Sequence, residues 1–426
     1  MSESPVTLVV VGQGYVGLPL AMRAVESGYR VVGLDTDAVR TAALAGGISF
    51  VEDVADETVR AALDSGRYLA SEDYADAADF DIAVITVPTP LKESLPDLSF
   101  IEDAARSLAV HIRRGACVVL ESTTYPGTTQ ELLVPLLEAG SGLTAGVDFA
   151  VGYSPERIDP GNPVWNFVNT PKVVSGIDEA SLTQVQTFYD TLVDKTVPVS
   201  TPREAELTKL LENTFRHVNI ALVNELAVFA RELGVDVWES IDAAATKPFG
   251  YMKFTPGPGV GGHCLPVDPS YLSWQVRRSL GKSFRFVELA NDINDHMPDY
   301  VVERSIELLN DRGKALRGSR VLLLGVAYKK NSGDSRESPA LRIIELLQGY
   351  GAEVSAADPH VIDARWPAGA TRVESSAAEV LASDLVIILT DHDEFDFAEL
   401  DRLTAAGNSL VFDTRRRLRS SSAHQL

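Results

Sequence analysis

The sequence predicts an α/β protein with two doubly wound parallel sheets, joined by a long central helix and a small helical domain. Two observations indicate the sheets: β-branched apolar runs alternate with helical patterns in residues 6–200, and the alternation returns after residue 320. A third indicates the helix, because no Gly or Pro occurs between Arg203 and Gly234, a length of about eight helical turns. We therefore expect domains at residues 1–200, 201–300 and 301–426.

The first strand is expected at residues 6–11 and runs into the sequence GQGYVG of residues 12–17. A helical pattern follows as far as Gly28, and a second strand at residues 30–34 ends at Asp35. Glycines at such a turn let a pyrophosphate reach the helix N-terminus. An acid at the end of the second strand suits the ribose 2′-hydroxyl of NAD and would repel the extra phosphate of NADP. This β-α-β unit predicts a Rossmann-like domain that binds NAD.

Further strands are expected at residues 81–87, 116–121 and 149–153. The loops that follow them carry Thr89, Thr123 and Glu156. Because ligands bind at the carboxyl ends of strands in open α/β sheets, these loops are candidate parts of a binding site. Cys117 lies within a strand among Val and Leu, so we interpret it as a core residue.

The central helix carries a long apolar stripe, which makes self-association into a homodimer our expectation. Its members at helical spacing are Leu207, Leu210, Leu211, Thr214, Phe215, Val218, Ala221, Leu222, Leu226 and Phe229. Lys209 and Asn213 are four residues apart and share one face of this helix. Taken alone, that pair indicates only a solvated helix face.

The third region repeats the first in outline. Strands are expected at residues 320–325, 353–358 and 385–389, with a helix at 339–347, and the second of these strands ends at Asp358. Its first loop lacks the three glycines and offers Lys329 and Lys330 instead, which suits a phosphate-bearing ligand other than the dinucleotide. The tail after Arg415 is basic and then rich in Ser, and we expect it to be disordered.

Cys264 lies in a segment dense in Gly and Pro, PGPGVGGHCLPVDP at residues 256–269. Glycines let a ligand come close, prolines fix the loop, and Asp268 follows the thiol by four residues. These features make Cys264 a candidate nucleophile, although a buried free cysteine that packs as a small apolar residue is the common alternative.

Composition excludes several classes of protein. The net charge of −22 argues against nucleic acid or an anionic membrane surface as a partner. No apolar run approaches the roughly 20 residues of a membrane span. Two cysteines cannot form a disulfide framework, so we expect a cytoplasmic protein.

Several motifs together resemble the UDP-glucose/GDP-mannose dehydrogenase family, over roughly residues 6 to 415. They are GQGYVG at 12–17, STTYPGT at 122–128, SPER at 154–157, GGHCLPVD at 261–268, and GVAYKK at 325–330 followed by RES at 336–338. The resemblance implies an NAD-dependent enzyme that oxidises C6 of a nucleotide-activated sugar to a carboxylate. It also implies an N-terminal NAD domain, a central dimerising helical region and a C-terminal nucleotide-sugar domain.

Carried over residue by residue, the resemblance makes Cys264 the nucleophile and Glu156 the general base for thioester hydrolysis. Lys209 and Asn213 match the family's lysine and asparagine on the central helix, and Thr123 with Asp268 match the pair that orders a catalytic water. The implied cofactor contacts are Gly12, Gln13, Gly14, Tyr15, Val16, Gly17, Asp35, Arg40, Thr89, Thr123 and Arg336. The implied substrate contacts are Glu156, Arg157, Lys209, Asn213, Arg216, Lys247, Gly257, Gly259, Gly261, Tyr328 and Lys329.

The identity of the sugar and of the nucleotide base stays open. His263 before the thiol, KPFG at 247–250 and NTFR at 213–216 look more like the subgroup that acts on UDP-N-acetylhexosamines than like the glucose type. UDP-glucose and dTDP-glucose remain alternatives, because YMKF at 251–254 and NSGD at 331–334 depart from that subgroup. The histidines show no metal-ligand spacing, so we predict no metal.

Two other functions remain possible at this point. One is a dehydrogenase of the hydroxyacid or 6-phosphogluconate kind, which oxidises its substrate once and needs no nucleophilic thiol. The other is a regulator without catalysis that binds NAD or a nucleotide sugar.

Overall fold

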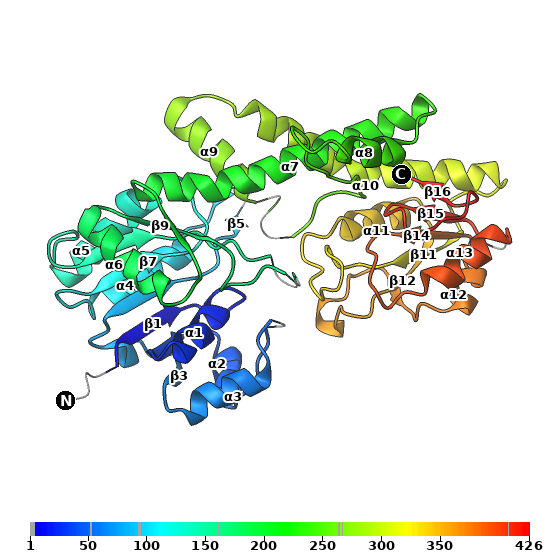
Figure 1. The fold of residues 1–426 in the computed structure, drawn as a ribbon. Helices are drawn as coiled ribbons and strands as arrows, with labels where there is room; N and C mark the ends of the chain where they lie inside the picture. The colour runs from blue at the N-terminus through cyan, green and yellow to red at the C-terminus, as the bar shows by residue number, and fades with distance from the viewer. Residues whose placement is uncertain are drawn as a thin grey trace. The chain divides into compact units, whose positions relative to one another are not determined.

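The protein is described by a computed structural model that covers residues 5–51, 53–92, 95–159, 162, 164–262, 265, 267–407 and 409–426. The chain divides into two compact units (Figure 1). The first contains Met1–Glu212 and Trp274–Gly281, and the second contains Asn213–Ser273 and Lys282–Leu426.

Within the described ranges, eight strands form the sheet of the first unit, in the order β10-β9-β8-β7-β4-β1-β2-β3. Neighbouring strands are parallel except β8 and β9, which pair antiparallel. The strand order reverses between β1 and β4, and a ligand-binding crevice forms at such a switch point. The strands are β1 (Thr7–Val11), β2 (Arg30–Leu34), β3 (Tyr68–Ser71), β4 (Ile82–Ile85), β7 (Cys117–Leu120), β8 (Ala150–Tyr153), β9 (Lys172–Gly176) and β10 (Thr196–Pro198).

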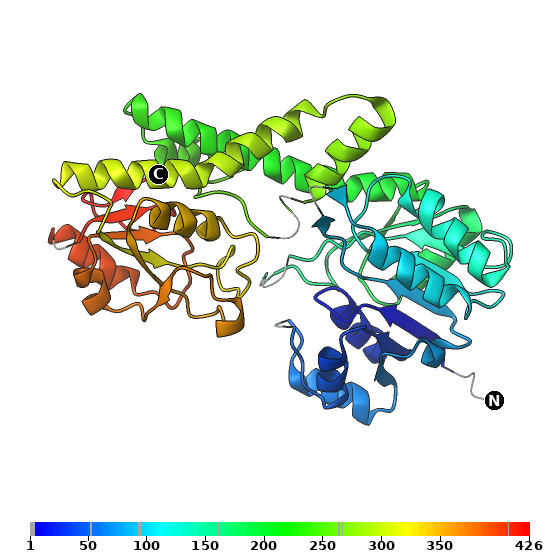
Figure 2. The same cartoon turned by 180° about the vertical axis from the view of Figure 1, so that it is seen from behind.

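Helices cover both faces of this sheet, as expected for buried parallel strands (Figures 1 and 2). One core is formed by residues of three helices: Leu18 of α1 (Gly17–Glu26), Val59 of α3 (Asp56–Asp64) and Phe188 of α6 (Glu179–Asp190). The other core includes Ile101 of α4 (Ser99–Ala109) and Leu137 of α5 (Val134–Ser141). The remaining elements are α2 (Ala38–Ala45), η1 (Tyr74–Ala77), β5 (Leu91–Lys92), β6 (Leu95–Pro96) and η2 (Thr129–Leu133).

The second unit repeats this topology with a sheet in the order β13-β12-β11-β14-β15-β16, whose pairings are all parallel in the described part of the chain. The strands are β11 (Arg320–Leu324), β12 (Glu353–Ala357), β13 (Thr371–Arg372), β14 (Leu385–Ile388), β15 (Val411–Asp413) and β16 (His424–Gln425). The helices of this unit outside α7 and α9 are α8 (Val237–Ala245), α10 (Arg285–Asp311), α11 (Pro339–Gly349), η3 (Asp363–Arg365), α12 (Ala377–Ala382) and α13 (Phe397–Ala405). Residues of α8, α10 and α11 pack in the core on one face of the sheet, and α12 and α13 pack on the other.

Two helices contribute residues to both units, namely α7 (Pro202–Glu232) and α9 (Asp268–Leu280). The predicted single long helix is confirmed as α7. The predicted stripe divides into two faces, because Leu210 and Ala221 are buried while other apolar residues stay exposed. The exposed apolar stripe of α7 consists of Leu207, Leu211, Phe215, Leu222, Leu226 and Phe229.

The predicted fold class is therefore confirmed, with two doubly wound sheets and a long helix. The predicted boundaries near residues 200 and 300 stay a prediction, since the division of the chain into compact units falls between Glu212 and Asn213, within α7. In the parts of the chain that the structure describes, no helix is both long and apolar enough to cross a membrane.

The prediction of a disordered tail after Arg415 is wrong. The tail ends in β16, which pairs with β15, and the side chains of Leu418 and Leu426 are buried. Trp238 Nε1 also donates a hydrogen bond of 3.2 Å to the carbonyl of Leu426. The prediction failed because it was based on the Ser-rich composition and overlooked Leu418 and Leu426. Burial of these two side chains and the pairing of β16 offset the loss of conformational entropy when the tail becomes ordered.

Candidate functional site

The glycine turn after β1 leads directly into α1 at the switch point of the first sheet. Gly12 has a φ of +93°, and a Cβ at Gly17 would lie 1.8 Å from the carbonyl oxygen of Gly12. A Cβ at Gly14, by contrast, would meet no atom within 4 Å. No described side chain caps α1, and its first turn carries no acid. The open space at Gly14 and the lack of a described capping side chain at the start of α1 fit a bound pyrophosphate.

Asp35 follows β2, where the predicted ribose contact belongs. Its Oδ2 accepts from the Gln13 amide at 2.9 Å, and its Oδ1 accepts from the Asp37 amide at 2.9 Å. Arg40 Nη1 lies 3.9 Å from Oδ2. A carboxylate oxygen accepts more than one hydrogen bond, so Asp35 keeps acceptor capacity for two ribose hydroxyls.

Two side chains hold the glycine turn from within. Gln13 is fully buried, with Nε2 donating to the Val10 carbonyl and Oε1 accepting from the Tyr68 hydroxyl. Thr86 Oγ1 contacts the carbonyls of Val11 and Gly12 at 2.9 and 2.8 Å. The side chain of Gln13 therefore shapes the turn, and its predicted contact with the cofactor stays a prediction. Thr86 was missed because a Thr at the end of a strand gives no signal in the sequence.

In the first unit, the structure brings Glu156 and Lys209 together. Glu156 lies in the loop after β8, and the Nζ of Lys209, on α7, donates to its backbone carbonyl at 2.5 Å. Both residues are buried, with exposed fractions of 9% and 8%. Arg157, a predicted substrate contact, pairs with Glu212 at 2.6 Å and donates to the Pro171 carbonyl.

The loop after β7 carries Thr123 and is held by a residue that the sequence did not reveal. The carboxylate of Glu206, on α7, accepts from the Gly127 amide, the Thr129 amide and the Thr129 hydroxyl. Burial raises the pKa of Glu206 to about 7, and these hydrogen bonds oppose the increase. Glu206 was missed because a glutamate within a charged helical segment is usually a surface residue.

In the second unit, the structure brings Asn213 and Asp268 together. Asn213 Nδ2 donates to Asp268 Oδ2 at 2.5 Å, and both residues are buried. Asp268 is the first residue of α9, where a carboxylate is stabilised by the helix dipole. Cys264 and His263 lie outside the described residues.

The glycines before Cys264 pack closely against the rest of the second unit. A Cβ at Gly257 would lie 2.8 Å from Arg415 Nη1, and one at Gly261 would lie 2.6 Å from the Glu337 carbonyl oxygen. Gly259 has a φ of +135°. At these positions, close packing and backbone conformation explain the glycines.

Asp358, after β12, is the counterpart of Asp35 but is used differently. Its Oδ2 accepts from the amides of Val326 and Ala327 at 2.8 and 3.0 Å, and Oδ1 accepts from the amides of His360 and Val361. His392 Nε2 lies 3.0 Å from Oδ2. Burial would raise the pKa of Asp358, but His392 and the loop amides together lower it to about 2. The protein's own donors thus occupy the carboxylate that would bind a ribose.

The other predicted residues lie on loops and helix faces within their own units. In the first unit, Thr89 follows β4, and in the second, Arg336 donates from Nε and Nη2 to the carboxylate of Asp334. Lys247 Nζ lies 4.9 Å from the centre of the Phe249 ring. The remaining predicted contacts are Tyr15 and Val16 before α1, Arg216 on α7, and Tyr328 and Lys329 in the loop after β11.

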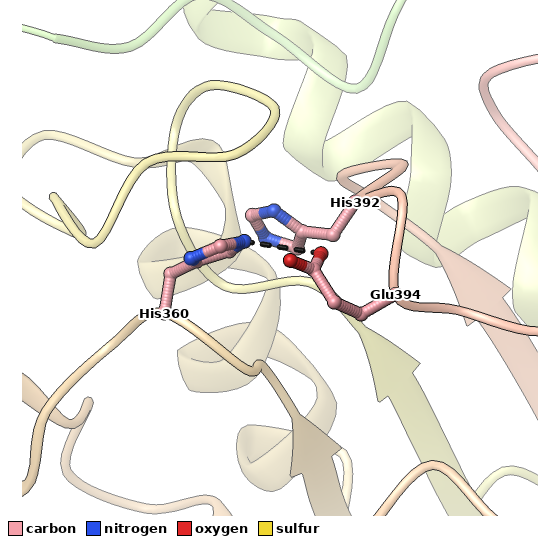
Figure 3. A group of neighbouring side chains, drawn as sticks. All are labelled: His360, His392 and Glu394. Atoms are coloured by element: carbon pink, nitrogen blue, oxygen red, sulfur yellow. Dashed lines mark hydrogen bonds and ion pairs between the residues drawn. The ribbon is translucent and has the colours of Figure 1, made fainter. Parts of the chain in front are cut away.

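Figure 3 shows His360, His392 and Glu394 turned toward one another, with ligand-type atoms within 4.8 Å. His392 Nδ1 accepts from the Asn331 amide at 2.9 Å, so its Nε2 carries the proton and donates to Asp358. A metal at Nε2 would have to displace both that proton and that hydrogen bond. We interpret the group as a polar network, which the sequence did not suggest because 32 positions separate the two histidines.

Comparisons with known proteins cover most of the chain. Residues 6–193, 203–296 and 322–420 match the NAD binding, central and UDP binding domains of the UDP-glucose/GDP-mannose dehydrogenase family. The chain is 36% identical to the UDP-N-acetyl-D-mannosamine dehydrogenase of Pyrococcus horikoshii, over 91% of this chain and 90% of that protein. It is 37% identical to the UDP-N-acetyl-D-glucosamine 6-dehydrogenase of Pseudomonas aeruginosa, over 91% of each.

Solved structures agree with these relatives. The UDP-D-ManNAc dehydrogenase structure from Pyrococcus horikoshii has a TM-score of 0.88 at 33% identity, covering 97% of this chain and 96% of that one. A UDP-glucose dehydrogenase structure from Pyrobaculum islandicum has a TM-score of 0.87 at 30% identity, covering 100% and 98%.

Proposed function

Because the chain belongs to the UDP-glucose/GDP-mannose dehydrogenase family and its cofactor is NAD, we propose that it oxidises a UDP-N-acetylhexosamine at C6 to the uronic acid. The relatives named for UDP-N-acetyl-D-mannosamine and UDP-N-acetyl-D-glucosamine support this choice of sugar. The motifs KPFG at 247–250 and NTFR at 213–216 point the same way.

The reaction converts an alcohol to an acid and therefore removes four electrons in two steps. NAD supplies the hydride acceptor for each step when it is bound. We assign to the Cys264 thiolate the capture of the intermediate aldehyde as a thiohemiacetal, which is oxidised to a thioester. Glu156 then accepts a proton from the water that hydrolyses the thioester and releases the thiol.

The observation that carries this proposal is the environment of Lys209. Its side chain is buried, its Nζ donates to the Glu156 carbonyl, and no ion pair joins it to a carboxylate among the described residues. A buried ammonium without a paired carboxylate is costly and usually serves a function. An oxyanion that forms during the reaction would provide the missing negative charge.

Asn213 and Asp268 complete the proposal. Asn213 lies one helical turn after Lys209 on α7, and its amide is oriented by the hydrogen bond to Asp268. We assign Asn213 to donate to the same oxyanion, and Asp268 with Thr123 to order the water.

The test measures NADH and sugar product together. The protein is incubated with NAD and, separately, UDP-N-acetylmannosamine, UDP-N-acetylglucosamine, UDP-N-acetylgalactosamine, UDP-glucose and dTDP-glucose. We expect an acetamido sugar to give two NADH per molecule and a product in which two hydrogens are replaced by one oxygen. One NADH per sugar would support a single oxidation, and binding without turnover would support a regulator.

A pair of cysteine variants tests the covalent route. Cys264→Ser should lose acid formation and keep NAD binding. The matched control is Cys117→Ser, because Cys117 is the buried first residue of β7 and burial raises the pKa of its thiol to about 12. Acid production by Cys264→Ser would remove the thioester from the account.

We further propose that the protein forms a homodimer through the exposed apolar stripe of α7. Phe215, Leu222 and Phe229 are between 46% and 53% exposed, although large apolar side chains on one helix face normally find a partner. Burial of these side chains against a second copy would contribute the apolar area that a stable interface needs.

A further inference from the structure

A buried charged cluster lies beside Glu156 and includes three residues that the proposed reaction does not use. Lys172 is the first residue of β9, Glu121 follows β7, and Tyr189 lies near the end of α6. Lys172 Nζ is 2.9 Å from Glu121 Oε1 and 3.5 Å from Glu156 Oε2. The side chains of Lys172 and Glu121 are 5% and 0% exposed.

Lys172 contacts the one oxygen of Glu156 that the backbone does not hold. Glu156 Oε1 accepts from the amides of Arg157 and Ile158, whereas Oε2 faces Lys172. Lys172 Nζ also donates to the Pro155 carbonyl at 3.3 Å. The ammonium therefore fixes both the backbone and the carboxylate of the loop that carries the proposed base.

The cluster holds two carboxylates and one ammonium, so Glu121 and Glu156 share one positive charge. The Tyr189 hydroxyl donates to Glu121 Oε1, and Glu121 Oε2 has no partner among the described residues. Burial raises the pKa of Glu121, although Lys172 opposes the increase. Burial disfavours the charged form of Lys172, but the two carboxylates hold its pKa above its usual value. Lys172 is therefore charged at neutral pH.

We propose that Lys172 and Glu121 are positioning residues for Glu156: Lys172 orients the Glu156 carboxylate through Oε2, and Glu121 competes with Glu156 for the same ammonium. The inference rests on the proposed role of Glu156. It explains why a protein would keep a buried ion pair with an unpaired oxygen, an arrangement that is a poor source of stability.

Two variants should change the pH dependence of acid formation in opposite directions. Glu121→Gln leaves Lys172 to pair with the Glu156 carboxylate alone. Activity should then persist to lower pH. The double variant Lys172→Met with Glu121→Gln removes the ammonium together with the fully buried Glu121 carboxylate, so that Glu121 is not left as a buried charge without a cation. Glu156 then loses its cation, and activity should be lost at a higher pH than in the wild type.

The other polar groups around Glu156 are not substituted in these variants, although the Tyr189 hydroxyl donates to an amide in place of a carboxylate when Glu121 becomes Gln. They are Arg157 with Glu212, Lys209 at the Glu156 carbonyl, and the Tyr189 hydroxyl, whose pKa is raised by burial and by Glu121. Lys172→Arg keeps the charge and should keep the wild-type profile. Lys195→Met, which removes an exposed lysine of the same unit, is the control.

The experiment is single-turnover formation of the uronic acid against pH, with KM for the sugar measured in parallel. We expect the rate to change and KM to stay within about twofold, since the cluster acts on the base and not on sugar binding. The quantity compared is the pH below which the rate falls. The inference would be overturned if this pH were the same in the wild type, Glu121→Gln and the double variant. It would also be overturned if both variants moved this pH in the same direction.

Glu156→Gln separates this failure from failure of the proposed function. If Glu156→Gln still forms acid at the wild-type rate, the role of Glu156 is wrong and the inference falls with it. If Glu156→Gln loses acid formation while the pH below which the rate falls is the same in the wild type and the other variants, only the inference is wrong.

Discussion

Replacing Asp358 by Asn should destabilise the second unit strongly and leave the first unit intact. The carboxylate receives four backbone amides and the Nε2–H of His392. An Asn side chain presents an NH₂ group in place of one oxygen, so at least two of these donors lose their acceptor. Each buried donor left unpaired costs about 1–3 kcal/mol, so we expect a loss of about 4 kcal/mol at pH 7.

The pH dependence of the free energy of unfolding gives a second, independent magnitude for the contribution of Asp358. The pKa of Asp358 is lowered from 3.8 to about 2 in the folded protein. Because the folded pKa is the lower one, the stabilisation is fully present above pH 3.8 and is lost as the pH falls through about 2. A shift of this size corresponds to about 2 kcal/mol, and Asp358→Asn should lack this acid-dependent part.

Urea unfolding combined with amide hydrogen exchange measures both effects. Exchange at Val326 and Ala327 should accelerate in Asp358→Asn, since their amides point at the carboxylate. Asp363→Asn is the matched control, because Asp363 is 93% exposed and its ion pair with Arg372 lies at the surface. A stability of Asp358→Asn within about 1 kcal/mol of the wild type would refute the reasoning.

Three further predictions concern the cofactor, the oligomer and the reaction. Asp35→Ser should weaken NAD binding and reduce discrimination against NADP in fluorescence titrations; unchanged discrimination would show that Asp35 does not contact the ribose. The pair Leu222→Glu and Phe229→Glu should shift the protein toward monomer in light scattering, and an unchanged mass would move the interface elsewhere. Lys209→Met should reduce kcat by about 10²–10³ while NAD binds normally, as expected for loss of an oxyanion donor; a loss of less than tenfold would remove Lys209 from the reaction.

The order of the elements and the first binding turn were predictable from the sequence, because local patterns encode them. Continuous β-branched apolar runs marked β1 and β2, helical patterns marked α1 and α7, and the structure places these elements within about two residues of the expected bounds. The glycines at residues 12–17 are sufficient to predict the turn, since the turn is formed by residues that are neighbours in the chain.

Contacts between distant residues could not be predicted. Asp35 and Asp358 follow equivalent strands, yet only the structure shows that His392 and the amides of residues 326 and 327 occupy Asp358. Lys172 stands among valines in a strand with no motif, and its two carboxylate partners lie 51 and 16 positions earlier in the chain. Composition gave a wrong prediction of disorder for the tail after Arg415, because the order of Leu426 depends on a contact with Trp238, which is distant in the chain.

The most direct test of the account asks whether the half-finished product is attached to the chain. Glu156→Gln should slow thioester hydrolysis, so acid quenching after mixing with NAD and the UDP-sugar should trap the sugar on the enzyme. We predict that peptide mass spectrometry finds this adduct on Cys264 and none on Cys117. Uronic acid formed by the wild type, with both cysteines unmodified in the trapped variant and Cys264→Ser still active, would contradict the covalent mechanism.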